Sequence, residues 1–377
     1  MVDDSSLMRK LITKIVEENS RLKVVDTALN GIFALKKIEK HHPDVVLLDI
    51  EMPEMDGIEF LEKCRDLNID IPIIVLSSLG KNRPEITLKC LALGAKDFII
   101  KPSGTISMDI ELVKDELLPK IIYYHNERPK TTIQKDQLQE TIEKYTHRES
   151  HKRQSAISPA DTEQEEIKKI PITVSEKIKT IPRLELLTIG ISTGGPHALR
   201  KIMPLFPPDF PLPILIVQHM PPGFTDEFAK GLDEICQLTV KEAEEGEKAQ
   251  SGVIYIARGD RHLQINREAE KNVIHLSDSP PENGHRPSVE VLFDSATASC
   301  GNRLISVIMT GMGKDGARAI KRVRLKGGIT IAQSENTCVV FGMPKVAIEM
   351  EGIDEILDLD NIVPRVLEIT NILFNGK

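Results

Sequence analysis

The stretch LELLTIGISTGGP at residues 184–196 decides the fold of the C-terminal half of this chain. Its first part, Leu184 to Ile189, is a short apolar run that is typical of a buried strand. Pro196 suits the first turn of a helix. Ser192 is therefore expected in a glycine-rich turn between a strand and a helix, where helix N–H groups point toward its hydroxyl. The pattern indicates either a nucleophilic serine or a serine that only caps the helix.

Two further polar side chains follow predicted strands in this half. His219 follows the apolar run at 214–218, and Asp315 lies in a glycine-rich turn after the run at 304–310. Because parallel strands gather their reactive groups at their carboxyl ends, we expect Ser192, His219 and Asp315 to converge. Imidazole is the usual base for a serine nucleophile, and a carboxylate fixes its tautomer. The order Ser, His, Asp differs from the Ser, Asp, His order of the α/β-hydrolase fold, so a different fold is expected.

Other histidines compete for the role of base. His197 follows Ser192 by five residues on the next helix and is expected to point away from the turn. His262 and His285 lie in predicted loops, and spacing alone leaves both open. Position favours His219.

Residues 1–125 also alternate strands and helices, which predicts a parallel sheet covered by helices on both faces. Strands are expected at 45–49, 71–76 and 98–100, and polar residues lie at their carboxyl ends and at the start of the chain: Asp3, Asp4, Asp49, Ser77 and Lys101. Converging carboxylates repel one another, and Mg²⁺ relieves that repulsion. A hydroxyl and an ammonium beside them suit a phosphoryl group. Each residue alone is an ordinary strand-end polar residue, but the set favours a metal and phosphoryl site.

The segment between these halves is polar. Residues 126–180 contain no glycine and one aromatic residue, Tyr145. Such a segment cannot bury a core, which predicts a flexible linker at 126–182 between domains at 1–125 and 183–377. Within it, Gln137 to Lys144 is expected to be transiently helical.

Composition excludes several classes. The net charge of −8 argues against a nucleic-acid binder, and no apolar run reaches the roughly 18 residues of a membrane span. Five scattered cysteines without a Cys-x-x-Cys pair predict reduced thiols. We therefore expect a cytoplasmic protein that neither binds nucleic acid nor inserts into a membrane. We also expect it to be a monomer.

The N-terminal domain resembles a response-regulator receiver domain. The matching residues are Val2-Asp3-Asp4-Ser5, Leu48-Asp49-Ile50-Glu51-Met52-Pro53, Asp56-Gly57, Ser77 and Lys101-Pro102. The resemblance implies that a histidine kinase phosphorylates Asp49. It also implies that Ser77 and Lys101 contact the phosphoryl oxygens, and that Mg²⁺ is held by Asp3, Asp4, Asp49 and the carbonyl of Glu51.

From about residue 183 the chain resembles the catalytic domain of the chemotaxis protein-glutamate methylesterases, the CheB family. The matching stretches are GISTGG at 190–195, QHMPPGFT at 218–225, HRPSV at 285–289, TGMG at 310–313 with Asp315-Gly316, and FGMP at 341–344. The resemblance implies Ser192 as nucleophile, His219 as base and Asp315 as orienting acid. Backbone N–H groups of Thr193 and Met312 would form the oxyanion hole.

The two resemblances together imply phosphorylation-activated hydrolysis of glutamate γ-methyl esters on chemoreceptors, with release of methanol. Deamidation of receptor glutamines is a further activity of some members, and no cofactor is expected in the esterase domain. We expect the unphosphorylated receiver to cover Ser192 and His219. The segment His285-Arg286-Pro287 indicates either a structural turn or a contact for an acidic receptor helix. A response regulator whose second domain only binds a partner is the alternative hypothesis.

The start of the chain is unusual for a receiver. Only Met1 and Val2 precede Asp3-Asp4, where receivers resemble one another in placing an apolar strand inside the sheet. The loss of about four buried aliphatic residues would remove roughly 6 to 12 kcal/mol, comparable to the stability of a small domain. We therefore expect that the natural protein starts several residues upstream, the alternative being a short protein with an unstable receiver.

Overall fold

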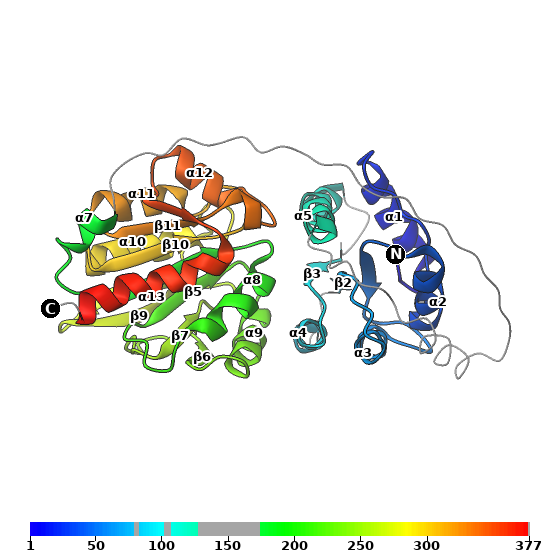
Figure 1. The fold of residues 1–377 in the computed structure, drawn as a ribbon, viewed down its shortest axis with the longest axis horizontal. Helices are drawn as coiled ribbons and strands as arrows, with labels where there is room; N and C mark the ends of the chain where they lie inside the picture. The colour runs from blue at the N-terminus through cyan, green and yellow to red at the C-terminus, as the bar shows by residue number, and fades with distance from the viewer. Residues whose placement is uncertain (79–82, 102–106, 127–173, 376–377) are drawn as a thin grey trace.

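The computed structural model describes residues 1–78, 83–101, 107–126 and 174–375. They form two α/β domains, which lie side by side in Figure 1. None of the described helices is apolar over the length that a membrane crossing needs. The predictions for residues 127–173, including the transient helix at 137–144, lie outside the described residues.

The N-terminal domain is a parallel sheet between helices. Its strands are β1 (Val46–Asp49), β2 (Ile73–Ser77) and β3 (Asp97–Ile100), paired in the order β1-β2-β3. Single parallel bridges join Val2 to Ala28 on one side and to Leu48 on the other. Two further strands of the flavodoxin-like order are thus each reduced to a bridge. The helices are α1 (Ser6–Glu17), α2 (Gly31–His41), α3 (Gly57–Asp66), α4 (Arg83–Ala92) and α5 (Ser107–Asn126).

The C-terminal domain is built on a seven-stranded parallel sheet of order β12-β11-β10-β4-β5-β7-β6. Its strands are β4 (Leu186–Ile191), β5 (Ile214–Gln218), β6 (Thr239–Glu242), β7 (Val253–Ile256), β10 (Leu304–Ile308), β11 (Ile329–Gln333) and β12 (Glu355–Leu357). The predicted fold class, a parallel α/β domain followed by a doubly wound parallel α/β domain, is confirmed. An antiparallel hairpin of β8 (His262–Glu268) and β9 (Lys271–Ser277) was not predicted.

Helices cover both faces of this sheet. One face packs against α8 (Gly195–Ile202), α9 (Phe224–Asp233) and α13 (Leu359–Asn375). The other packs against α10 (Val289–Cys300), α11 (Ala317–Leu325) and α12 (Met343–Glu349). Strand β4 is buried on both faces, as its continuous apolar run predicts, with Leu187 and Leu186 in opposite cores.

The end of the predicted linker is part of the C-terminal domain. Residues Val174–Ile178 form the short helix α7. The Lys177 ammonium donates to the buried Asp354 carboxylate at 2.7 Å and to the Gly328 carbonyl at 2.8 Å. Sequence alone assigned this segment to the linker because it is short and polar, and its anchor lies far along the chain.

The two domains touch through aromatic side chains. Phe98 of β3 stacks on Phe224 of α9, with ring centroids 5.5 Å apart and 13° between the ring planes. Tyr124 of α5 lies edge-on to His197 of α8 at 5.8 Å. Helix α4 contacts α9, and the two helices face each other at the domain boundary in Figure 1. The receiver thus contacts both helices that follow the strands of Ser192 and His219.

Candidate active site

The turn that carries Ser192 is tightly packed. Ser192 follows β4, its N–H donates to the Thr310 carbonyl at 2.9 Å, and its carbonyl accepts from Gly195 at 2.8 Å. Gly194, the N-cap residue of α8, has φ +80°, so a side chain there would be strained. A Cβ on Gly195 would lie 1.8 Å from Oε1 of the buried Gln218. The turn therefore needs glycine for close approach as well as for backbone geometry.

The structure brings Ser192, His219 and Asp315 together. Nδ1 of His219 lies 3.1 Å from Oγ of Ser192, and Nε2 of His219 lies 2.9 Å from Oδ2 of Asp315. All three residues lie just beyond the carboxyl ends of neighbouring strands β4, β5 and β10. The imidazole can thus accept the hydroxyl proton through Nδ1, while the carboxylate holds a proton on Nε2.

Asp315 is buried and fully hydrogen-bonded. Besides His219, it accepts from the Asn283 amide at 3.0 Å, the Ser288 hydroxyl at 2.7 Å and the Val289 N–H at 2.7 Å. Burial acts to raise the pKa of Asp315, but the hydrogen bonds, led by that from His219, bring the pKa well below its usual range. The carboxylate therefore stays ionised, as a group that stabilises an imidazolium must.

Two backbone N–H groups beside Ser192 are free to bind an oxyanion. In the described part of the chain, neither the Thr193 N–H nor the Met312 N–H has a hydrogen-bond acceptor. Gly311 lies against Ser192, because a Cβ on Gly311 would meet the Ser192 Cβ at 2.8 Å. The predicted oxyanion donors therefore flank the serine on two different turns.

The competing histidines have distinct places. His197 packs on Tyr124 at the domain contact, and buried His262 bonds the Pro280 carbonyl through Nε2 at 3.1 Å. His285, in contrast, stacks on the ring of His219, with centroids 3.9 Å apart and 12° between the planes. His285 and the Asp315 partners Asn283 and Ser288 lie on one segment, whose role sequence reasoning left open or missed. The motif at 285–289 was a signal for His285 and Ser288, whereas Asn283 lies outside it.

A second cluster lies at the carboxyl edge of the receiver sheet. One carboxylate oxygen from each of Asp3, Asp4 and Asp49 lies within 4.8 Å of the others. Lys101 donates to Asp3 and to Asp49, each at 2.7 Å. Burial raises the pKa of Asp49, in spite of Lys101. Three converging carboxylates, of which only Asp3 and Asp49 pair with the Lys101 ammonium, fit a divalent metal ion.

The two other predicted receiver residues lie near the same edge of the sheet. The Ser77 hydroxyl lies at the end of β2, buried, 2.6 Å from the Thr87 hydroxyl of α4. Glu51 lies two residues beyond β1 with its side chain exposed. Their predicted roles toward phosphate and metal therefore stay predictions.

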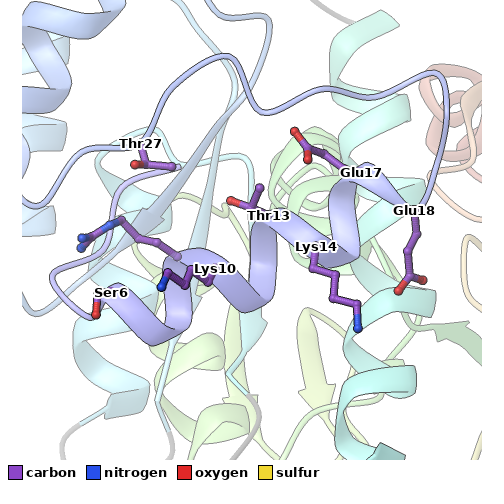
Figure 2. Close-up of a pocket in the computed structure, with 8 residues that line it drawn as sticks. Ser6, Lys10, Thr13, Lys14, Glu17, Glu18 and Thr27 are labelled. Carbon is purple, nitrogen blue, oxygen red and sulfur yellow. The ribbon is translucent and has the colours of Figure 1, made fainter.

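A separate surface groove runs over α1. Figure 2 shows its lining side chains, among them Lys10, Thr13, Lys14 and Glu17. It shares no residue with either cluster described above. We assign it no role.

Comparisons with known proteins place both halves of the chain. Residues 187–366 match the family model described as CheB methylesterase, and residues 1–111 match that of the response regulator receiver domain. The chain is 43% identical over 366 residues to a protein-glutamate methylesterase/protein-glutamine glutaminase of Treponema denticola, covering 97% of this chain and 96% of that protein. A protein of the same name from Halalkalibacterium halodurans is 42% identical, with 97% and 96% covered.

Two solved structures are similar to parts of the chain. The CheB methylesterase catalytic domain of Thermotoga maritima is 45% identical, with 49% of this chain and 98% of that chain covered and a TM-score of 0.49. The response regulator domain of Thermotoga maritima CheB is 40% identical, with 34% and 95% covered and a TM-score of 0.31.

Proposed function

The chain belongs to the CheB methylesterase family, and on that premise we propose that it hydrolyses glutamate γ-methyl esters on chemoreceptors when Asp49 is phosphorylated. The hydrogen-bonded series Ser192, His219 and Asp315, with distances of 3.1 and 2.9 Å, is the observation that carries the proposal. The proposed location is the cytoplasm, which is a reducing compartment, because all five cysteines are free thiols. The protein is proposed to act as a monomer.

The first chemical step is acylation. His219 Nδ1 takes the Ser192 proton while Oγ attacks the ester carbonyl carbon. The tetrahedral oxyanion is held by the N–H groups of Thr193 and Met312. The imidazolium, stabilised by Asp315, then returns its proton to the methoxy oxygen, so that the C–O bond breaks and methanol leaves.

The second step restores the enzyme. Water attacks the acyl carbon while His219 Nδ1 takes one of its protons, and the collapse of the intermediate expels Ser192 Oγ, which recovers that proton. The receptor regains a glutamate carboxylate. A glutamine side chain would follow the same route with ammonia as leaving group, which is the proposed deamidation.

We propose that the unphosphorylated receiver restrains this site. Three receiver contacts fall on segments next to the triad: Phe98 on Phe224, Tyr124 on His197, and the receiver core on Val339. Val339 in turn packs on Gly194, where a Cβ would meet it at 2.3 Å. A substrate helix that approaches Ser192 must displace or avoid these contacts.

The phosphorylation site is joined to that contact by a short strand. Lys101, which pairs with Asp49, lies one residue beyond β3, and Phe98 lies within β3. A phosphoryl group on Asp49 adds negative charge beside Lys101 and so biases a two-state surface. When bound, Mg²⁺ would supply charge neutralisation for phosphoryl transfer, held by Asp3, Asp4, Asp49 and Glu51. A histidine kinase is the proposed phosphodonor.

Methanol release from methylated receptor, with and without a small-molecule phosphodonor, tests this function. We expect release to rise with the phosphodonor, and Ser192→Ala to abolish it. Methanol release by Ser192→Ala at the wild-type rate would refute the mechanism. Removal of residues 1–173, which retains α7, should raise the basal rate, and an unchanged rate would refute the restraint.

The alternative, a second domain that only binds a partner, is separated by labelling. A fluorophosphonate should modify Ser192 if His219 activates it, whereas a serine that merely caps α8 should not react. The alignment of His219 and Asp315 with Ser192 favours reaction.

A further inference from the structure

One face of the His219 ring is covered by another imidazole. The His285 and His219 rings lie nearly parallel, 3.9 Å between centroids, which is closer than most aromatic pairs. Within the described residues, no side-chain hydrogen bond is made by the His285 ring. Its contact with His219 is therefore the principal feature of its environment.

The backbone that carries His285 is fixed on both sides. Glu282 and His285 exchange two backbone hydrogen bonds, of 3.1 and 3.0 Å. Next in the chain, Arg286 donates to the Asp260 carboxylate at 2.7 Å and to the Asp278 carbonyl at 3.0 Å. Asn283 reaches Asp315. These contacts fix the backbone on both sides of His285 and so hold its ring against His219.

This contact supplies what the triad hydrogen bonds lack. Ser192 and Asp315 meet opposite edges of the His219 ring and fix its rotation within its own plane. Neither bond strongly resists a tilt of the ring out of that plane, about the axis joining the two nitrogens. A flat ring against one face opposes that tilt and keeps water from that face.

The charge state of His285 suits this position. His219 becomes an imidazolium during acylation, and a second cation stacked on it would oppose that step. Burial, with a smaller contribution from His219, lowers the pKa of His285 to about 4, against the opposing effect of Asp315. Among the described residues, His219 and Asp315 are the titratable groups whose charges act on the pKa of His285. His285 is therefore neutral at physiological pH.

We propose that His285 is a positioning residue, whose neutral ring holds the imidazole of His219 in the plane that joins Ser192 to Asp315. The proposal rests on the proposed function in that it assigns His219 as the base. It deepens that function, because the segment at 283–289 then orients both the base and the carboxylate.

The test compares His285→Ala, which removes the ring, with His285→Phe, which keeps a flat uncharged ring. His275→Ala is the matched control, because His275 lies on β9 and pairs with Glu245, outside the site. Each full-length variant is assayed for the rate of fluorophosphonate labelling of Ser192 and for kcat and KM of methanol release in the presence of phosphodonor. Thermal unfolding reports folding.

We expect His285→Ala to lower labelling and kcat by about ten- to a hundredfold with KM unchanged, since misplacing a catalytic group costs that much. His285→Phe should restore most of both, and His275→Ala should match wild type. Wild-type rates in His285→Ala would overturn the proposal, as would equal losses in His285→Phe and His285→Ala in folded protein. If His285→Ala does not fold, a rate near that of wild type in His285→Phe supports the proposal, and a loss of about tenfold or more in folded His285→Phe overturns it.

The two proposals fail differently. Absence of methanol release by wild type with normal labelling of Ser192 would refute the proposed substrate and leave the positioning test intact. Methanol release by wild type with labelling insensitive to His285→Ala would refute the positioning role alone.

Discussion

Phe98→Leu should raise the basal esterase activity. Phe98 and Phe224 form a stacked pair across the domain contact, and both rings are buried. Leucine fills much of the same space and keeps the receiver core apolar, but it cannot stack. The Lys120 ammonium, 5.8 Å from the centroid of the Phe98 ring, also belongs to the receiver. The substitution therefore removes this contact equally from the closed form, in which the domains touch, and from the open form, in which they do not. Only the cross-domain contact changes the balance between those forms.

The magnitude follows from the pair energy. An aromatic pair contributes about 0.5 to 1.5 kcal/mol beyond the area that it buries. At 1.36 kcal/mol for each factor of ten, its loss shifts the ratio of open to closed molecules by about two- to thirteenfold. While the open form is a minority, activity without phosphodonor should rise by the same factor. The chain lacking residues 1–173 sets the upper limit.

The assay is methanol release without and with phosphodonor, at equal protein concentration. We expect a raised rate only in its absence, because the phosphorylated form no longer depends on the contact. Phe206→Leu is the matched control: Phe206 pairs with Phe210 at 4.8 Å inside the catalytic domain, so its loss should not activate. A Phe98→Leu chain that folds normally, yet is no faster than wild type while the truncated chain is faster, would refute the reasoning.

Three further predictions follow from the described contacts. Gly195→Ala should lower kcat by about a hundredfold, because its Cβ would displace Gln218 and shift the serine turn. Gly231→Ala is the control, because the nearest atom to a Cβ there is 3.8 Å away. Equal kcat values for the two variants would count against a tight turn at Ser192. The folded-state pKa of Asp315 lies below its unfolded value of 3.8, so its stabilising contribution is present above that pH and lost as the pH falls below it. Urea unfolding from pH 6 down to 3 should show a steeper loss for wild type than for Asp315→Asn, and parallel curves would contradict this. Mg²⁺ at about 100 times its Kd should stabilise the receiver by about 2.7 kcal/mol, and calorimetry should show a smaller gain for Asp4→Asn than for wild type.

Much of the fold could be predicted from apolar runs. The run at 184–189 gives β4 within two residues at either end, and the runs before His219 and Asp315 give β5 and β10. Such strands are recognisable because both faces of a parallel sheet are buried. The convergence of Ser192, His219 and Asp315 then follows from topology, since all three lie beyond carboxyl ends of adjacent strands.

The rest depends on contacts between distant residues. Strand β8 alternates buried Leu263 and Ile265 with polar residues, but the alternation stops at Arg267 and is too short to predict a strand with its partner. Asp315 is held by Asn283 and Ser288, whose positions follow that hairpin and not a strand end. The same holds for α7, whose anchor, Asp354, is visible only in the folded chain.

The regulation proposed above is independent of dilution, because one chain carries both domains. The receiver therefore meets its own active site within one molecule, and Lys177 of α7 fixes where the connection joins the catalytic domain. Two separate domains would associate to an extent that depends on the concentration of each, whereas linked domains meet at an effective concentration on the order of millimolar. A covalent connection replaces that requirement with a fixed local concentration, so a cell with few copies of the protein would keep the same proportion of restrained enzyme as one with many.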